Sequence, residues 1–211
     1  MAHSISRRDF LKMAGAGIGA AALTCAGLTA LGTHTPMIDM YESEREGGMN
    51  DRVLIVYASK CGSTGEVAKV IADELTARGK TVDVRLAKNA STVEGYRAVI
   101  VGSAIRIGRW LPEAVRFVEL QQQVLRQLPT AFFAVHMENL GDDENSRKNR
   151  LAYLDPVREI VPPQYEGFFA GKVDLAQLSL IERTLAKAAQ SQIGDLRDWD
   201  KIRRWGNTIL T

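Results

Sequence analysis

The chain has 211 residues, of which 45% are hydrophobic and 25% are charged. These proportions exclude a disordered or fibrous chain and are typical of one soluble domain. The formal net charge is only +2 at pH 7, so there is no electrostatic case for a nucleic-acid-binding protein, which needs a clearly basic surface.

Residues 1–32 are predicted to form an export signal that is not part of the folded domain. The basic stretch "SRRDFLK" at residues 6–12 precedes an uncharged run of small apolar residues at 13–32, an order that is typical of targeting segments. The run is rich in Ala and Gly, so it would insert only weakly into a bilayer. The segment resembles bacterial twin-arginine signals, which implies handling by the twin-arginine translocase.

This signal predicts a periplasmic protein, or one on the outer face of the cytoplasmic membrane. Cleavage is expected at Ala30-Leu31-Gly32 or after Cys25-Ala26, and an uncleaved signal would anchor the protein to the membrane. Residues 33–50, "THTPMIDMYESEREGGMN", lack sustained periodicity and predict a flexible tether. Met49 offers an alternative start, from which a form without the signal would be made.

Cysteine and histidine usage points away from disulfides and metals. Cys25 and Cys61 are the only cysteines of the chain, so cleavage after residue 26 would leave Cys61 alone. The domain must then be stabilised by packing, which a core of about 160 residues can supply. The three histidines lie far apart in the sequence, and no Cys or His spacing suggests a metal site.

Residues 51–211 are predicted to form one domain in which strands and helices alternate. Apolar runs predict strands at 53–58, 81–87, 97–104, 130–137 and 166–173, and helical spacing predicts helices at 64–79, 111–127, 143–160 and 198–210. The alternation predicts a parallel sheet with helices on both faces. Five strands favour the flavodoxin-like, doubly wound α/β fold with strand order 2-1-3-4-5, which binds its ligand beyond the carboxyl ends of the strands.

The loop after the first strand has the composition of a phosphate site. Ser59, Lys60, Gly62, Ser63 and Thr64 crowd the turn before a predicted helix. Backbone N–H groups and hydroxyls at a helix N-terminus bind anions, and neither a Walker loop nor a dinucleotide fingerprint is present. A phosphate monoester is therefore expected. The alternative is a capping box, with Ser63 as N-cap and Glu66 three residues later.

Two further loops follow neighbouring predicted strands. In "VIVGSAIRIGRWLP" (99–112), the glycines are expected to let the backbone approach a flat ligand, and Trp110 to stack on one; the alternative is that Trp110 is a core or surface aromatic. The third loop, "FAVHMENLGDDEN" (133–145), is polar and follows a buried strand. Residues 174–196 predict an amphipathic helix packed on the sheet edge, since they are less basic than a membrane-surface helix.

Residues 51–210 resemble the flavodoxin superfamily, and within it the menaquinone-dependent protoporphyrinogen oxidases. The resemblance rests on Val-Leu-Ile-Val-Tyr-Ala-Ser-Lys-x-Gly-Ser-Thr, on Val-Ile-Val-Gly-Ser-Ala-Ile-Arg-Ile-Gly, and on Asp198-Trp199. It implies FMN, with the phosphate on Lys60 to Thr64 and the ring against residues 103–110 and 134–139. The expected FMN contacts are Ser59, Lys60, Cys61, Gly62, Ser63, Thr64, Ser103, Ala104, Ile105, Arg106, Gly108, Trp110, His136, Met137 and Asn139.

The sequence departs from this family at three points, of which the export signal is the largest, because the haem-precursor oxidation of the family normally takes place on the cytoplasmic side. The family's aromatic residue between Arg and Gly is Ile107 here, and the family's basic insertion is replaced by the less basic segment 174–196. The export signal also fits the cofactor, because noncovalent FMN is inserted in the cytoplasm and the twin-arginine route carries folded proteins.

Two functions follow from the resemblance. The first is an FMN oxidoreductase that passes electrons from a porphyrinogen-like or other reduced organic donor to a quinone. The second is an exported electron carrier that docks a redox partner protein. The balanced charge favours the enzyme, since carrier flavodoxins usually have a strongly acidic face. No catalytic acid or base is identified from the sequence.

Overall fold

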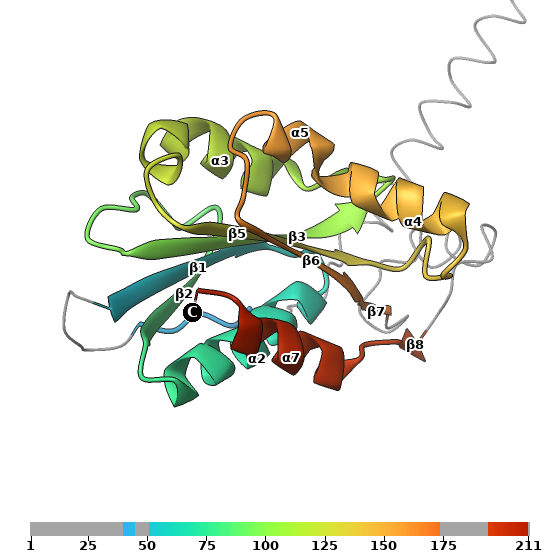
Figure 1. Ribbon diagram of the computed structural model, residues 1–211, viewed down its shortest axis with the longest axis horizontal. Coiled ribbons are helices and arrows are strands. Elements are labelled where there is room, and N and C mark those ends of the chain that lie inside the picture. The colour runs from blue at the N-terminus through green and yellow to red at the C-terminus, as the bar shows by residue number, and fades with distance from the viewer. Residues whose placement is uncertain (1–39, 45–50, 174–193, 211) are drawn as a thin grey trace, which may run out of the picture. The chain divides into compact units, whose positions relative to one another are not determined.

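The computed structural model describes residues 40–44, 51–173 and 194–210 of the chain (Figure 1). The predicted signal at 1–32, most of the predicted tether and most of segment 174–196 lie outside the described residues.

A parallel five-stranded sheet forms the centre of the domain. Its order is β2-β1-β3-β5-β6, which confirms the predicted order 2-1-3-4-5 once a short extra strand is set aside. The strands are β1 (Arg52–Ala58), β2 (Thr81–Leu86), β3 (Ala98–Arg106), β5 (Thr130–His136) and β6 (Tyr165–Ala170). The inner strands are almost entirely buried because helices cover both faces, which explains their continuous apolar sequences.

Three short strands lie outside this parallel set. β4 (Arg109–Trp110) pairs antiparallel with the end of β3, and β7 (Lys172–Val173) pairs antiparallel with β8 (Gly194–Asp195). The predicted strand at 166–173 is therefore two strands, β6 and β7, separated at Gly171. The backbone N–H of Gly171 donates to the carbonyl of His136 at 2.9 Å.

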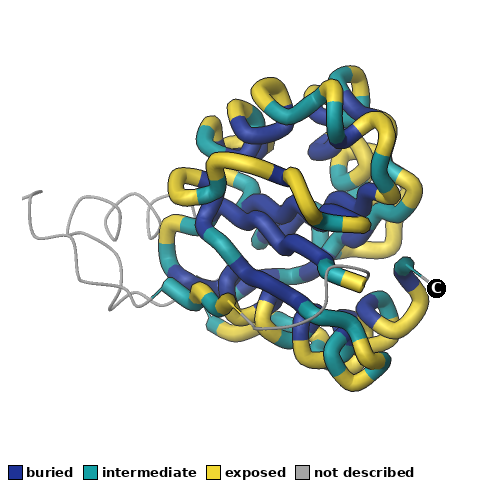
Figure 2. Tube along the Cα trace, turned by 90° about the vertical axis from the view of Figure 1, so that its left-hand side faces the viewer, coloured by how far each residue is buried: buried dark blue, intermediate teal, exposed yellow. Residues whose placement is uncertain are grey.

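Helices form a layer on each face of the sheet. α2 (Ser63–Ala77) and α7 (Trp199–Thr208) cover one face, whereas α3 (Pro112–Leu125), α4 (Glu144–Leu151) and α5 (Asp155–Arg158) cover the other (Figure 1). The predicted helix at 143–160 is broken by the 3₁₀ turn η2 (Ala152–Leu154). Figure 2 shows the buried strands between these two layers, whose outer turns are exposed.

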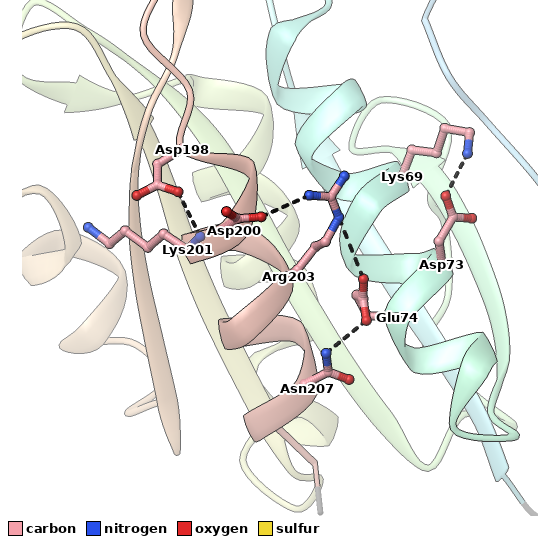
Figure 3. A network of polar contacts seen from close by, with 8 residues as sticks. All are labelled: Lys69, Asp73, Glu74, Asp198, Asp200, Lys201, Arg203 and Asn207. Carbon is pink, nitrogen blue, oxygen red and sulfur yellow. Dashed lines mark hydrogen bonds and ion pairs between the residues drawn. The ribbon is translucent and has the colours of Figure 1, made fainter.

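Polar side chains at the start of α7 and between α2 and α7 hold the helical layer that these two helices form. The Asp198 carboxylate accepts from the Lys201 backbone N–H at 2.9 Å and caps α7. Glu74 of α2 accepts from Asn207 of α7 at 2.8 Å and lies 3.9 Å from Arg203 (Figure 3). These contacts hold the first and last helices of the domain side by side.

Residues 40–44, part of the predicted tether, lie against β2. The N–H and C=O of Ser43 both bond to Val84 in an antiparallel bridge, and Met40 and Tyr41 pack on the core beneath α2. These five residues are thus part of the packed domain, a contact that tether-like composition does not predict.

Candidate functional site

The loop after β1 turns sharply into α2 through Gly62. Gly62 has φ 77°, is the N-cap residue of α2, and accepts from the N–H groups of Gly65 and Glu66 through its carbonyl. Ser63 is the first helical residue and makes no capping hydrogen bond. The capping box that the sequence offered as an alternative to a ligand site is therefore absent. Glu66 instead pairs with Arg197 at 2.8 Å.

Two buried hydroxyls in this loop have no hydrogen-bond partner in the described part of the chain. They are Oγ of Ser59 and Oγ1 of Thr64, and Thr64 is completely buried. A buried hydroxyl without a partner is unfavourable by roughly 1–3 kcal/mol, so this pair needs an explanation. An anion at the N-terminus of α2 supplies one, because hydroxyls and the first N–H groups of the helix would donate to it.

Lys60 and Cys61 complete the loop. The ammonium of Lys60 lies 3.6 Å from the Glu113 carboxylate in the first turn of α3, with both side chains about half exposed. This contact links the loop at residues 59–64, here named the phosphate-type loop, to α3. Cys61 forms no disulfide within the described residues and has intermediate exposure.

Gly102 and Ser103, in the middle of β3, have structural explanations. A Cβ at Gly102 would lie 2.0 Å from Cζ of Phe133, so Gly102 makes room for a buried ring and not for a flat ligand, which corrects the sequence-based interpretation. Oγ of Ser103 accepts from the Leu111 N–H at 2.9 Å and donates to the Ala104 carbonyl at 2.9 Å. This side chain fixes the chain beyond β4 onto β3.

The second loop is a β-hairpin. Ile105 pairs with Trp110 and Arg106 with Arg109, and the two turn residues Ile107 and Gly108 have φ 51° and 68°. Such a two-residue turn with both φ values positive normally contains Asn-Gly or Gly-Gly. Ile107 is 90% exposed at the tip, although a β-branched residue rarely adopts positive φ.

Trp110 is a core residue. It is 5% exposed and packs edge-on against Phe132, with ring centroids 5.6 Å apart. Its ring therefore does not offer a face for a flat ligand to stack on, and the alternative reading of a core aromatic describes its position. Its indole Nε1–H is buried without a partner among the described residues.

The third loop begins with a buried, neutral histidine. Nδ1 of His136 lies 2.7 Å from the Glu138 carbonyl, so this nitrogen carries the proton. The pKa of His136 is lowered to about 4, mainly by burial and also by the charges of Arg150 and Lys201, whereas the hydrogen bond to the Glu138 carbonyl opposes the shift. His136 is therefore uncharged at neutral pH.

Asn139 and the residues after it are held by α4 and η2. Asn139 has φ 56°, its amide donates to the Tyr153 hydroxyl at 2.6 Å, and its carbonyl accepts from Arg150 at 2.6 Å. Arg150 also donates to the Gly141 carbonyl at 3.0 Å. Sequence reasoning missed Arg150 and Tyr153 as supports of the loop, although their i, i+3 spacing on a helical segment was an available signal.

The three loops meet at the carboxyl ends of the central strands of the sheet. β1, β3 and β5 are adjacent, with Ala58 in register with Ser103 and Ala104 in register with Val135. The loops at 59–64, 103–110 and 136–141 therefore start side by side, as expected for parallel strands. The described residues contain no group of three or more potential metal ligands, and no helix within the described ranges is long and apolar enough to span a membrane.

Comparison with known proteins identifies the family. Residues 54–198 match the model of the flavodoxin domain. The chain belongs to the flavodoxin family. Residues 4–24 match the model of the twin-arginine translocation signal sequence, so the N-terminus carries a signal of that pathway.

The chain is also similar to named enzymes. It is 24% identical over 170 residues to protoporphyrinogen IX dehydrogenase (quinone) of Leishmania major, covering 74% of this chain and 73% of that protein. It is 30% identical over 88 residues to the Escherichia coli (strain K12) protein of the same name, covering 41% of this chain and 49% of that protein. A short-chain flavodoxin associated with a bacterial microcompartment shares the fold, with a TM-score of 0.51 at 12% identity over 75% of this chain and 96% of that one.

The family makes FMN the cofactor of this domain, and the residues present fit it. The two orphaned hydroxyls and the N-terminus of α2 suit a terminal phosphate, and neighbouring loops are available for a ring. Bound FMN supplies the redox chemistry, which makes the chain an FMN-type oxidoreductase domain.

Proposed function

We propose that this protein transfers electrons from a reduced organic donor of the porphyrinogen type to a quinone, at the outer face of the cytoplasmic membrane. The observation that carries the proposal is the pair of buried, unpartnered hydroxyls of Ser59 and Thr64 at a helix N-terminus, because it makes the site fit for a cofactor. The names of the two enzymes to which the chain is similar supply the donor and acceptor class.

Within this proposal, residues 59–64 hold the FMN phosphate. Ser59 and Thr64 donate their hydroxyl hydrogens to it, and Lys60 contributes charge from the rim of the loop. The helix dipole of α2 adds to the attraction. The residues expected to border the ring lie in the hairpin and in the third loop: Ser103, Ala104, Ile105, Arg106, Gly108, His136, Met137 and Asn139.

His136 and the hairpin shape the space around the ring. Neutral His136 adds no charge beside it, and the Arg150 guanidinium fixes the backbone at Asn139 and Gly141. The exposed hairpin tip at Ile107 would limit access of a donor from solvent. A donor of this class loses two electrons and two protons in each oxidation step, and a quinone gains them on becoming a quinol.

The cofactor assignment is tested by Thr64→Val in the full-length protein. This change removes only the orphaned hydroxyl, so FMN affinity should fall by about tenfold or more, while the apoprotein should be as stable as before or more so. Thr76→Val is the matched control, because Thr76 lies in the same helix and its hydroxyl already donates to the Ala72 carbonyl. Titration of the apoprotein with FMN and with riboflavin, which lacks the phosphate, gives the measurement. Equal loss for both flavins would contradict a phosphate contact.

The reaction is tested by stopped-flow reduction of the flavin-loaded protein. Protoporphyrinogen should reduce it and a soluble menaquinone analogue should reoxidise it. A carrier would instead be reduced rapidly by a flavodoxin reductase, at a rate that falls with salt because exposed charges govern docking. If only the reductase reduces the protein, and the donor reduces it no faster than it reduces free FMN, the protein is an electron carrier and not an enzyme.

A further inference from the structure

Residues 40–44, here named the N-terminal strap, cover the outer edge of the sheet. β2 is the edge strand on this side. The N–H of Ser43 donates to the Val84 carbonyl at 3.0 Å, and the N–H of Val84 donates to the Ser43 carbonyl at 2.8 Å. The strap lies outside residues 54–198, which match the flavodoxin domain.

The strap also binds the end of β2 through an acidic side chain. The carboxylate of Glu42 accepts from the Leu86 backbone N–H at 2.9 Å and from the Asn89 amide at 2.9 Å. Glu44 is exposed, as is Glu42, and forms an ion pair with Arg85 at 2.7 Å. Hydrogen bonds from a buried backbone N–H to a carboxylate stabilise more than exposed ion pairs do, so Glu42 is the stronger anchor.

One residue connects the strap to the phosphate-type loop. The hydroxyl of Tyr57 donates to the Tyr41 carbonyl at 2.8 Å. The ring of Tyr57 is completely buried at the end of β1, and burial raises the pKa of Tyr57 well above its ordinary value, so the hydroxyl remains a donor.

The other side of the Tyr57 hydroxyl faces the first turn of α2. A Cβ added at Gly65 would lie 2.7 Å from this oxygen, so the tyrosine and the helix backbone are in close contact. Gly65 directly follows Thr64, whose orphaned hydroxyl belongs to the candidate phosphate site. The Tyr57 hydroxyl therefore lies between the strap and the turn that carries Thr64.

We propose that the strap is a positioning element of the flavin site. By holding the Tyr57 hydroxyl against Gly65, it fixes the first turn of α2 in the geometry that receives the FMN phosphate. This inference rests on the proposed phosphate assignment. A chain that starts at Met49 lacks the strap and is expected to retain FMN less well, so cofactor retention would be linked to the form that carries the export signal.

The test uses full-length protein with single substitutions. Glu42→Ala and Tyr57→Phe should each weaken FMN binding by about threefold to tenfold, the value expected for one hydrogen bond, and should leave riboflavin affinity within about twofold. Glu44→Ala is the matched control, because it removes the same charge from the strap without touching Leu86. Glu42→Gln keeps an oxygen acceptor for the Leu86 N–H and should restore most of the FMN affinity.

Hydrogen exchange gives a second readout. In Glu42→Ala and Tyr57→Phe the amides in the first turn of α2 should exchange faster, whereas those of β5 should not change. Lower thermal stability with unchanged affinity for FMN, or an equal loss for FMN and riboflavin, would make the strap merely structural and overturn the proposal. If Thr64→Val also leaves FMN affinity unchanged, the phosphate assignment itself fails, which separates the two failures.

Discussion

The guanidinium of Arg197 donates to the carboxylate of Glu66 at 2.8 Å, and so joins the segment before α7 to the first turn of α2. The Arg197 side chain is only 3% exposed, also binds Asp195 at 2.6 Å, and lies 4.3 Å from the centre of the Trp199 ring. Burial opposes its charge, but the hydrogen bonds to Asp195 and Glu66 outweigh burial and raise the pKa of Arg197. The N-terminus of α2, which forms part of the candidate phosphate site, is thus held by a residue near the C-terminal end of the domain.

Arg197→Ala should destabilise the domain by about 2–3 kcal/mol, since it removes hydrogen bonds of a buried charge and its packing on Trp199. Urea unfolding of the apoprotein measures the loss. Arg203→Ala is the control: Arg203 is half exposed and pairs with Asp200 at 3.2 Å (Figure 3), so its loss should be under about 1 kcal/mol. Equal effects of the two substitutions would contradict a special role for Arg197.

His136 should make stability depend on pH. Its pKa is about 4 in the folded protein against 6.5 for an ordinary histidine, so the unfolded chain takes up the proton first as pH falls. The stabilisation is complete above about pH 6.5, is lost between there and pH 4, and amounts to about 3 kcal/mol.

The measurement is urea unfolding of the wild type and of His136→Asn at several pH values from 7.5 to 4. Asparagine keeps a donor for the Glu138 carbonyl but does not titrate, so the variant should have a flatter pH profile over this range. Parallel profiles of the two proteins would mean that the pKa of His136 is the same in the folded and the unfolded states.

Ile107→Asn should stabilise the apoprotein by about 1 kcal/mol, because a left-handed conformation is costly for Ile and acceptable for Asn, and Asn-Gly is the preferred turn here. Gly108→Ala is the opposite control, since a Cβ there meets nothing within 4 Å but φ is +68°, and it should destabilise. An Asn variant of unchanged stability would show that Ile107 is not strained.

Replacing Arg7 and Arg8 by lysine should leave the full-length protein in the cytoplasm, still folded and loaded with flavin. The receptor reads the arginine pair itself, so keeping the charge should not rescue export. Cell fractionation with flavin fluorescence measures the distribution. Normal export of the double variant would show that residues 13–32 act as an ordinary signal.

Local sequence was sufficient for the framework of this protein. The apolar runs at 53–58 and 130–137 predicted strands buried on both faces, because only strands covered by two helical layers are apolar without alternation. The strand order and the meeting of three loops at one edge followed from the alternation of strands and helices. The "SRRDFLK" motif likewise predicted the signal, since a linear motif needs no fold to be recognised.

The tertiary structure decided what individual side chains do. Gly102 and Trp110 looked like ligand contacts from their place in a loop, but their neighbours are Phe133 and Phe132, which come from another strand. Glu66 pairs with Arg197 and not with Ser63. The Tyr41 carbonyl accepts a hydrogen bond from the Tyr57 hydroxyl. These partners come from chain segments far apart in sequence, and spacing along the chain carries no information about such contacts.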